Sequence, residues 1–380
     1  MKIWSPLIAT LLLLSVTSAQ VYEDDNFIID IVEDDNDSSP EIVNVKPVID
    51  GPLPCNGYPE YRKLPVNQAF YLGANNAGSH VFSNDCQVKQ QNDIPQMLKD
   101  GVRFLDINLC LNDEKQMVIC SDHDSAISNT SFRNVLDDIF QFARDNVEQI
   151  FIVHLQSRGV HQPLDVKDVD KLLDETCKVH TELTDGTDEY VAFECPFIYK
   201  HEKGPWATMG ELVNYNPDMA QWEGDGELVG VRSRIIFTHS DSVLHAPEYT
   251  SPYFTSTFWR ALKADDISNL MGYLKKECRI PAGGIKVDAY SEATCSAETY
   301  TPEQIEELLF YKSACNLNDS PLNTFISVLS VDQYQKHLPY YKELESRVME
   351  SNYAKWNGEY QFIRPSYLVS IKPKMVRDEL

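Results

Sequence analysis

The sequence predicts an α/β protein: a single TIM-like (β/α) barrel, not necessarily ideal in shape, that follows an acidic leader. Short apolar runs alternate with amphipathic helical patterns, which is typical of a mainly parallel sheet. About seven or eight such units fall within roughly 310 residues, and this number fits one barrel better than two domains. No internal repeat is visible.

Eight apolar runs are the strand candidates. The clearest are β-branched and end at polar residues, as in IFIVHL and RIIFT. Such runs suit strands that are buried on both faces. In chain order the predicted strands are 69–72, 102–109, 117–120, 150–155, 193–199, 234–238, 285–287 and 324–331. The predicted helices, which show apolar spacings of three and four, are 93–99, 133–146, 166–180, 265–277 and 302–312.

Composition limits the choice of partners. The 380 residues are 43% hydrophobic and carry a formal net charge of −25. A chain this acidic repels nucleic acid, so we expect no nucleic-acid partner. It also repels anionic lipid surfaces unless a local basic patch or a cation intervenes, so only peripheral contact with a membrane is expected.

Both ends of the chain predict the secretory pathway. Lys2, the apolar run 7–16 and the small residues 17–19 form a signal-peptide pattern at 1–19, and no other run is apolar enough for a transmembrane segment. Residues 20–52 are an acidic leader without sustained periodicity, which predicts disorder. The barrel domain is expected at 53–367. The tail, 368–380, ends in RDEL, which is similar to the signal read by the ER-retrieval receptor. The protein is therefore expected to be secreted or held in the ER lumen.

Nine cysteines without a C-x-x-C pair argue against zinc. In an oxidising compartment they predict up to four disulfides and one thiol, with pairing left open. A Cys55–Cys86 bridge would bracket the first loop, and Cys315 could pair with Cys278 or Cys295. Sequons at Asn36, Asn129 and Asn318 predict a glycoprotein.

Polar residues follow nearly every predicted strand. In a barrel, chemistry is carried by the carboxyl ends of the strands, so these residues are expected to share one mouth. Some of them could instead cap the following helices. They are Asn75, Asn76, His80, Asp106, Asn108, Ser121, Asp122, His123, Asp124, His154, Gln156, Arg158, His239, Asp241, Asp288, Tyr290 and Asp332.

Several blocks, in order, resemble the X domain of phosphatidylinositol-specific phospholipase C, particularly its secreted PLC-like relatives. CNGYPEYRKLPVNQAFYLGANNAGS is similar to the family's opening strand, which ends in Gly-Thr-His-Asn-Ser. The later blocks are LKDGVRFLDINLCLNDEKQMVICSDHDS, VLDDIFQFARDNVEQIFIVHLQ, GPWATMGELV and RSRIIFTHSD. The resemblance covers about residues 55–332 and implies a phosphoric diester hydrolase of lipid metabolism that acts on a phosphoinositide or GPI-type substrate.

The resemblance also implies a mechanism. An inositol 2-hydroxyl attacks its own phosphodiester, one histidine removes the proton, a second protonates the leaving alcohol, and Ca²⁺ or Arg stabilises the charge. Here the first histidine falls on Asn75 and the second on Ser121. An amide cannot act as the base at neutral pH. His80 and His123 are the displaced candidates for these roles, while Arg158, His154, His239 and Tyr290 are candidates for substrate binding.

By the same resemblance, a weak Ca²⁺ site would use Asn76, Asp106, Asn108 and Gln156, whose oxygens suit a hard cation. Three functions remain open. The protein could be a divergent phosphodiesterase, or an inactive barrel that binds a phosphoinositol, glycan or protein ligand. It could also carry another barrel chemistry, such as glycoside hydrolysis by a carboxylate pair among Asp106, Asp241, Asp288 and Asp332.

Overall fold

The computed structural model describes part of the chain, and every structural statement below concerns that part. The described residues are 55–84, 86–121, 126–156, 164–181, 195, 197–213, 234–240, 244–245, 249–263, 269, 272, 284–289, 301–306, 309 and 325–357. The predicted signal peptide, acidic leader and RDEL tail lie outside them, as do His123, Arg158, Asp241 and Tyr290.

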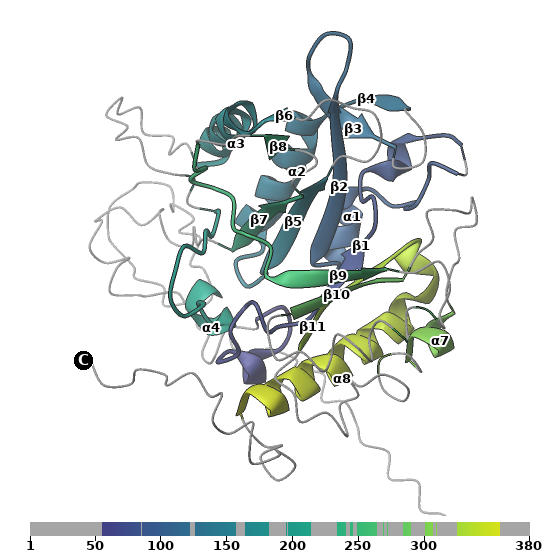
Figure 1. Cartoon of the computed structure of the whole chain (residues 1–380), viewed down its shortest axis with the longest axis vertical. Helices are drawn as coiled ribbons and strands as arrows, with labels where there is room; N and C mark the ends of the chain where they lie inside the picture. The colour runs from purple at the N-terminus through teal and green to yellow at the C-terminus, as the bar shows by residue number, and fades with distance from the viewer. Residues whose placement is uncertain are drawn as a thin grey trace, which may run out of the picture. The chain divides into compact units, whose positions relative to one another are not determined.

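A parallel sheet forms the centre of the fold (Figure 1). Seven strands follow one another by parallel pairing. Their order is β7 (Ile235–His239), β5 (Phe151–Gln156), β2 (Phe104–Leu111), β1 (Tyr71–Ala74), β11 (Phe325–Val331), β10 (Gly284–Ala289) and β9 (Trp259–Lys263). This confirms the α/β class and the parallel sheet.

The ring of strands is open on one side. Among the described residues, β7 and β9 do not pair with each other. Two single bridges lie along β7 instead, Ile198 with Ile235 and Phe237 with Phe254. Where it is described, the predicted strand at 193–199 therefore forms one β-bridge. Among the described residues the sheet is open, whereas the sequence predicts a barrel.

A short antiparallel extension continues from β2. Its strands β3 (Met117–Cys120) and β4 (Ile127–Ser131) pair in turn with the end of β2. The Cys110–Cys120 disulfide ties β2 to β3. Asn129, the sequon within β4, is exposed. Two-residue strands β6 (Leu164–Asp165) and β8 (Leu244–His245) pair separately.

Helices cover the sheet. They are α1 (Ile94–Lys99), α2 (Phe132–Asp145), α3 (Val166–Thr181), α4 (Met209–Val213), α7 (Pro302–Glu306) and α8 (Leu338–Asn357), with short 3-10 turns η1 (Pro59–Tyr61), η2 (Ser79–Val81) and η5 (Tyr334–His337). The Asp93 side chain accepts from the Gln96 N–H at 2.9 Å and caps α1. Ser131 caps α2 in the same way. In Figure 1, α2 and α3 lie beside each other and α8 runs past β11.

Sequence patterns located most of these elements within three residues, and β3 matches its predicted range. The 20-residue helix α8 was not predicted, because it buries polar side chains as well as apolar ones and shows no clean apolar stripe. These buried polar residues are Glu345, Ser351, Asn352 and Lys355. The strands β4 and β9 were not predicted either, and β9 reads WRALK, with only two of its five residues buried.

The cysteines pair in part as expected. A second disulfide, Cys177–Cys195, joins α3 to the segment before Ile198. Cys55 is a buried thiol rather than half of a disulfide, and burial raises its pKa to about 11. Cys86 is disulfide-bonded. The suggested Cys55–Cys86 bridge is therefore wrong. Cys55 is fully buried in the core as a thiol and takes no part in that bridge.

Candidate functional site

Polar side chains gather inside the sheet at the carboxyl ends of its strands. Successive side chains of a strand point to opposite faces, so residues two apart share the interior. Neighbouring strands are in register here, which places Asp106 beside His154 and Asn108 beside Gln156. The group that we call the mouth comprises Asn75, Asp106, Asn108, His154, Gln156, Lys286, Asp288, Ser330 and Asp332, each at most 9% exposed.

Lys286 lies between two carboxylates of the mouth. Its ammonium group donates to Asp106 Oδ2 at 3.2 Å and to Asp288 Oδ1 at 2.5 Å. The lysine is 4% exposed and Asp106 is fully buried. A buried cation is stable only when anions or dipoles replace its water, and these two carboxylates do so. The Phe104 ring lies 5.3 Å from the ammonium and adds a cation–π contact.

An aromatic layer lies beside this ion pair. Phe104 stacks on His154 with ring centroids 5.9 Å apart, and Trp259 meets both rings edge-on. His154 Nδ1 shares a hydrogen bond of 2.9 Å with Thr238 Oγ1 on β7. The layer fixes the His154 ring in position, with its Cα in register with Asp106.

The first strand ends in a polar corner. Asn75 Nδ2 donates to Asp332 Oδ1 at 2.8 Å, and Lys89 Nζ lies 3.8 Å from Asp332 Oδ2. Gln90 Nε2 donates to the carbonyls of Asn75 and Val331 and locks the ends of β1 and β11 together. The side-chain amide at position 75 is therefore held by the Asp332 carboxylate.

The turn that follows Asn75 and the strand that precedes it each place a backbone requirement on one residue. Asn76 has φ of 45°, a left-handed conformation that Asn tolerates better than most residues. The Ala77 N–H then donates to the Asp106 carbonyl at 2.7 Å, which fixes the turn against β2. At Gly73 a Cβ would come within 3.1 Å of the Phe104 ring and 3.2 Å of the Leu329 carbonyl. A side chain at position 73 would therefore require these neighbours to shift by a few tenths of an ångström.

Some mouth groups have no hydrogen-bond partner within the described part of the chain. Both polar atoms of Asn108 are in this state, as are Asn75 Oδ1 and Ser330 Oγ. Asn108 and Ser330 are fully buried. Orphaned buried polar atoms cost free energy, and these atoms are available to accept or donate a hydrogen bond.

The candidate histidines are dispersed. His80, in η2, interacts electrostatically with Asp93 and Asp138, which belong to the α1 cap and to α2 rather than to the mouth. Burial lowers its pKa. His239, at the end of β7, packs edge-on against Phe254 and contacts the Ser240 carbonyl. Among the described histidines, only His154 lies within the mouth.

The predicted Ca²⁺ ligands are brought to one end of the sheet. Asn76, Asp106, Asn108 and Gln156 are all buried there. However, Asp106 is already paired with the Lys286 ammonium, so a divalent cation at its carboxylate would meet a positive charge. Within the described residues no cluster of three His, Cys, Asp or Glu side chains could hold a metal. Calcium binding therefore stays a prediction, with Lys286 as its competitor.

Sequence reasoning missed Lys286, Lys89, Trp259 and Ser330. The signal for Lys286 was present in GGIKVDAY, where alternation places Lys286 and Asp288 on one face of a short strand. Ser330 follows the same rule, two residues before Asp332. Nothing in the pattern of β9 marked Trp259, because that strand was not predicted.

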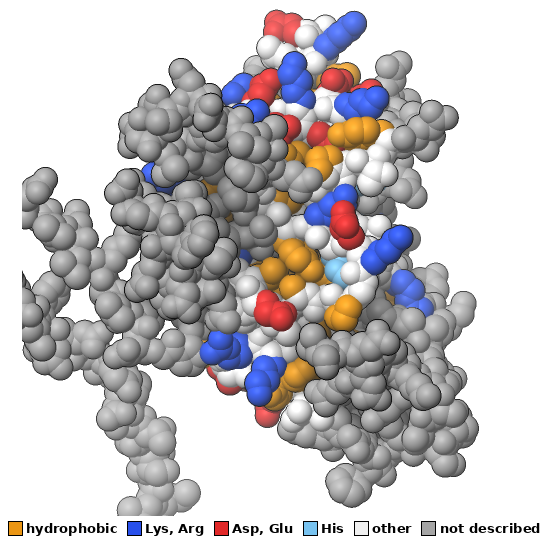
Figure 2. All heavy atoms as spheres, turned by 90° about the vertical axis from the view of Figure 1, so that its left-hand side faces the viewer, with side chains coloured by type: hydrophobic (Ala, Val, Ile, Leu, Met, Phe, Trp, Pro, Cys, Tyr) orange, Lys and Arg blue, Asp and Glu red, His pale blue; other side chains and the backbone are white. Residues whose placement is uncertain are grey.

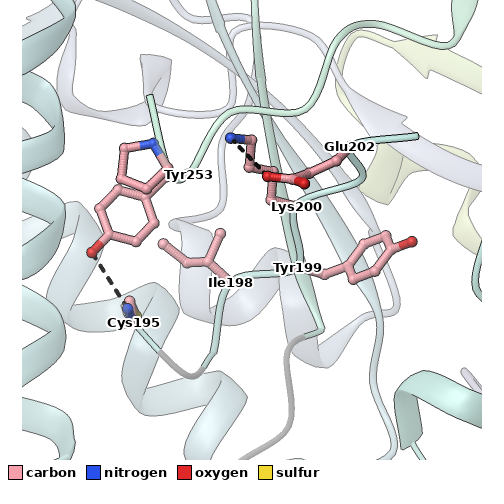
Figure 3. Close-up of a pocket in the computed structure, with 7 residues that line it drawn as sticks. Cys195, Ile198, Tyr199, Lys200, Glu202 and Tyr253 are labelled. Carbon is pink, nitrogen blue, oxygen red and sulfur yellow. Dashed lines mark hydrogen bonds and ion pairs between the residues drawn. The ribbon is translucent and has the colours of Figure 1, made fainter. Parts of the chain in front are cut away.

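A separate cavity lies outside the mouth, beside the Cys177–Cys195 disulfide (Figure 3). It has a volume of about 270 Å³ and is lined by Cys195, Ile198, Tyr199, Lys200, Glu202, Pro252 and Tyr253. Lys200 donates to the Ser251 carbonyl at 2.7 Å and pairs with Glu202 at 3.7 Å. Figure 2 shows apolar side chains among charges of both signs on one face of the molecule.

Comparisons with known proteins agree with the resemblance. Residues 77–178 match the family model "Phosphatidylinositol-specific phospholipase C, X domain". No curated protein sequence matches the chain. No helix in the described part of the chain has the length and apolar character to cross a membrane.

Three solved structures illustrate the fold comparison. The phosphatidylinositol-specific phospholipase C of Listeria monocytogenes is 12% identical, with 77% of this chain and 95% of that chain covered and a TM-score of 0.44. The Staphylococcus aureus enzyme is 11% identical, covering 76% and 93%, with a TM-score of 0.44. A calcium-dependent enzyme from Pseudomonas sp. is 10% identical, covering 65% and 74%, with a TM-score of 0.30. Residues 77–178 are therefore similar to the X domain of the phosphatidylinositol-specific phospholipase C family.

Proposed function

We propose that the protein is a divergent PLC-like phosphodiesterase-family barrel of the secretory pathway. Its mouth binds a phosphoinositide or GPI-type ligand without the family's acid–base cleavage. The observation that carries the proposal is the Asn75–Asp332 hydrogen bond of 2.8 Å. By the resemblance, Asn75 stands where the family has its base, and the Asp332 carboxylate that holds it is a group able to orient an imidazole.

The chemistry follows from these groups. In-line attack needs a group that accepts the hydroxyl proton near neutral pH, and an amide cannot do so. The mouth still contains groups that suit ligand binding. Its buried amides, hydroxyls and carboxylates match a polyhydroxylated headgroup. The orphaned atoms of Asn108 and Ser330 support binding, since a ligand would satisfy them.

A second candidate function is slow phosphodiester hydrolysis with a relocated base. His154 favours it, because this imidazole lies in the mouth, bonded to Thr238 and in register with Asp106. Hydrolysis by this route would be abolished by His154→Ala and would not require position 75.

A lipid assay tests the proposal. The full chain is mixed with phosphatidylinositol vesicles, with Ca²⁺ or EGTA, and binding is measured by sedimentation and turnover by release of the inositol phosphate. We expect binding without turnover. We expect Asn75→His to gain turnover, because Asp332 would orient the new imidazole, and Asn75→Gln to serve as the silent control.

Other results would decide against the proposal. Absence of binding to phosphatidylinositol or to a GPI glycolipid would reject it. Wild-type turnover that disappears in His154→Ala would establish the second candidate instead. Membrane contact is expected to be peripheral.

The secretory assignment has a test of its own. Asn129 is exposed on β4. The expressed protein is therefore expected to lose mass on endoglycosidase treatment, and deletion of residues 377–380 is expected to move it into the medium. An unglycosylated cytosolic product would contradict this assignment.

A further inference from the structure

We infer that the cavity beside the Cys177–Cys195 disulfide is a binding site for one neutral sugar ring, which Lys200 and Glu202 hold together (Figure 3). Ile198, in the cavity lining, forms a β-bridge with Ile235 at the start of β7. The cavity therefore lies near the amino end of that strand and shares no residue with the mouth. The inference is independent of the proposed function.

A disulfide and hydrogen bonds fix the walls of the cavity before a ligand binds. The Cys177–Cys195 disulfide ties one wall to α3. The Cys195 N–H donates to the Tyr253 hydroxyl oxygen at 3.3 Å, and this hydroxyl in turn donates to Asp174 of α3. A site whose walls are already ordered loses less entropy when it binds, so a small ligand with few contacts can be retained.

Two side chains of opposite charge supply the polar groups of the cavity. Lys200 Nζ donates to the Ser251 carbonyl at 2.7 Å and lies 3.7 Å from Glu202 Oε1. An ammonium group has three donors, and Lys200 meets only these two acceptors among the described residues. Glu202, whose side chain is 77% exposed, accepts no hydrogen bond from those residues. The cavity therefore presents a free N–H donor beside a free carboxylate acceptor.

The charges of this pair select the class of ligand. An anion would be repelled by Glu202 and by a chain of net charge −25, and a cation would be repelled by Lys200. A hydroxyl both donates and accepts, so neighbouring hydroxyls of one molecule can bond the ammonium and the carboxylate without separating them. A zwitterion such as an amino acid would have to break the ion pair. A neutral polyol therefore fits the pair best.

The size and the apolar lining of the cavity indicate a single ring. Its volume is about 270 Å³. A cavity of about 150 Å³ holds benzene, and pockets for drug-sized ligands start at about 300 Å³. One substituted six-membered ring therefore fits, whereas a whole lipid or an oligosaccharide does not. The side chains of Ile198, Pro252 and Tyr253 supply apolar contacts for the C–H face of a pyranose.

Glycoside titrations of the full chain test the inference. The probes are the methyl glycosides of glucose, galactose, mannose and N-acetylglucosamine, and binding is followed by saturation-transfer NMR and calorimetry. We expect at least one of them to bind. Lys200→Met and Glu202→Gln should each raise its Kd by about tenfold or more, because each removes a charged hydrogen-bonding partner. Lys203→Met, which changes an exposed lysine of the same segment outside the cavity lining, is the matched control and should bind like the wild type.

Other results would overturn the inference. Absence of binding by all four glycosides would do so, as would equal binding by the wild type, Lys200→Met and Glu202→Gln. Leucine that binds in place of the glycosides would identify a zwitterion site instead. If Lys200→Met fails to fold, Glu202→Gln decides, because it keeps the size of an exposed side chain.

Two further comparisons place the site. A glycopeptide with the same terminal sugar identifies the source of the ring: binding tighter than that of the methyl glycoside indicates a glycan chain, and equal or weaker binding indicates a free sugar. Asn108→Leu, a change in the mouth, should leave glycoside binding unchanged, and loss of binding in this variant would overturn the inference. Failure of vesicle binding with the glycoside results intact would reject the proposed function alone.

Discussion

The two ends of the parallel strands use buried cations in opposite ways. At the amino ends, Arg234 and Arg103 directly precede β7 and β2 and donate to backbone carbonyls. Arg234 bonds the Asn146 and Ala143 carbonyls at 2.5 and 2.7 Å, and Arg103 bonds those of Leu98 and Val102 at 2.6 and 2.8 Å. At the carboxyl ends, Lys286 meets carboxylates beside orphaned amides.

This contrast separates polar groups that stabilise the fold from polar groups that have no partner in the described part of the chain. Each arginine donates to one carbonyl in the last turn of a helix, Leu98 in α1 or Ala143 in α2, and to one carbonyl beyond that helix, Val102 or Asn146. Burial lowers the pKa of both guanidinium groups to about 10, far above neutral pH, so both stay charged. The two guanidinium groups are thus held by backbone acceptors at the amino end, whereas in the mouth both polar atoms of Asn108 have no partner among the described residues.

The largest expected effect is at the satisfied end. Arg234→Met would remove the donor of the buried Ala143 carbonyl and one of two donors of the Asn146 carbonyl, which also accepts from the Gln149 N–H at 3.2 Å. We therefore expect a loss of about 3 kcal/mol in the free energy of unfolding. Urea denaturation measures it. Arg133→Met is the control, because Arg133 is exposed and lies 3.5 Å from Glu175. That pair should contribute less than about 1 kcal/mol. Equal losses in the two variants would refute the structural role of Arg234.

A smaller effect is expected for Arg234→Lys. Lysine keeps the positive charge but lacks the planar fork that spans two carbonyls. We therefore expect a loss of about 1–2 kcal/mol, between the wild type and Arg234→Met. Wild-type stability in this variant would show that charge alone, rather than the geometry of the hydrogen bonds, matters at the amino end.

The smallest effect concerns pH and His80. Burial lowers the pKa of this histidine in the folded state below its ordinary 6.5. As the pH falls through 6.5, the unfolded chain takes up the proton first, so the folded state loses stability. We expect the urea midpoint to fall between pH 7.5 and pH 5.5, and to fall less in His80→Gln. An identical pH dependence in the two proteins would contradict this assignment.

The sequence predicted the parts of the fold that depend on local pattern. The β-branched runs located β5, β7 and β11, and the apolar spacing located α2 and α3. It could not predict β9 or α8, because Trp259 and the buried polar residues of α8 are placed by packing against distant segments. Strand alternation could place Asp106 and Asn108 on one face. No local pattern could show that Lys286 lies 3.2 Å from Asp106, since the two residues are 180 positions apart.

In the proposed function, the unsatisfied polar groups of the mouth serve a ligand. One paired measurement tests it directly, because two fully buried asparagines lie in contrasting surroundings. Asn352 Nδ2 donates to the carbonyls of Gln68 and Ile326, each at 2.9 Å, and only its Oδ1 has no partner among the described residues, whereas neither polar atom of Asn108 has one. Replacing each by leucine compares the same chemical change in both settings.

We expect Asn352→Leu to lower the free energy of unfolding by about 2 kcal/mol and to leave vesicle binding unchanged. Asn108→Leu should leave the stability of the ligand-free protein within about 1 kcal/mol of the wild type, or raise it, and should abolish binding to phosphatidylinositol vesicles. Asn108→Leu could instead destabilise the protein as much as Asn352→Leu and still bind the vesicles. That result would show that the mouth is a structural core, and it would contradict the proposal that its polar groups bind a ligand.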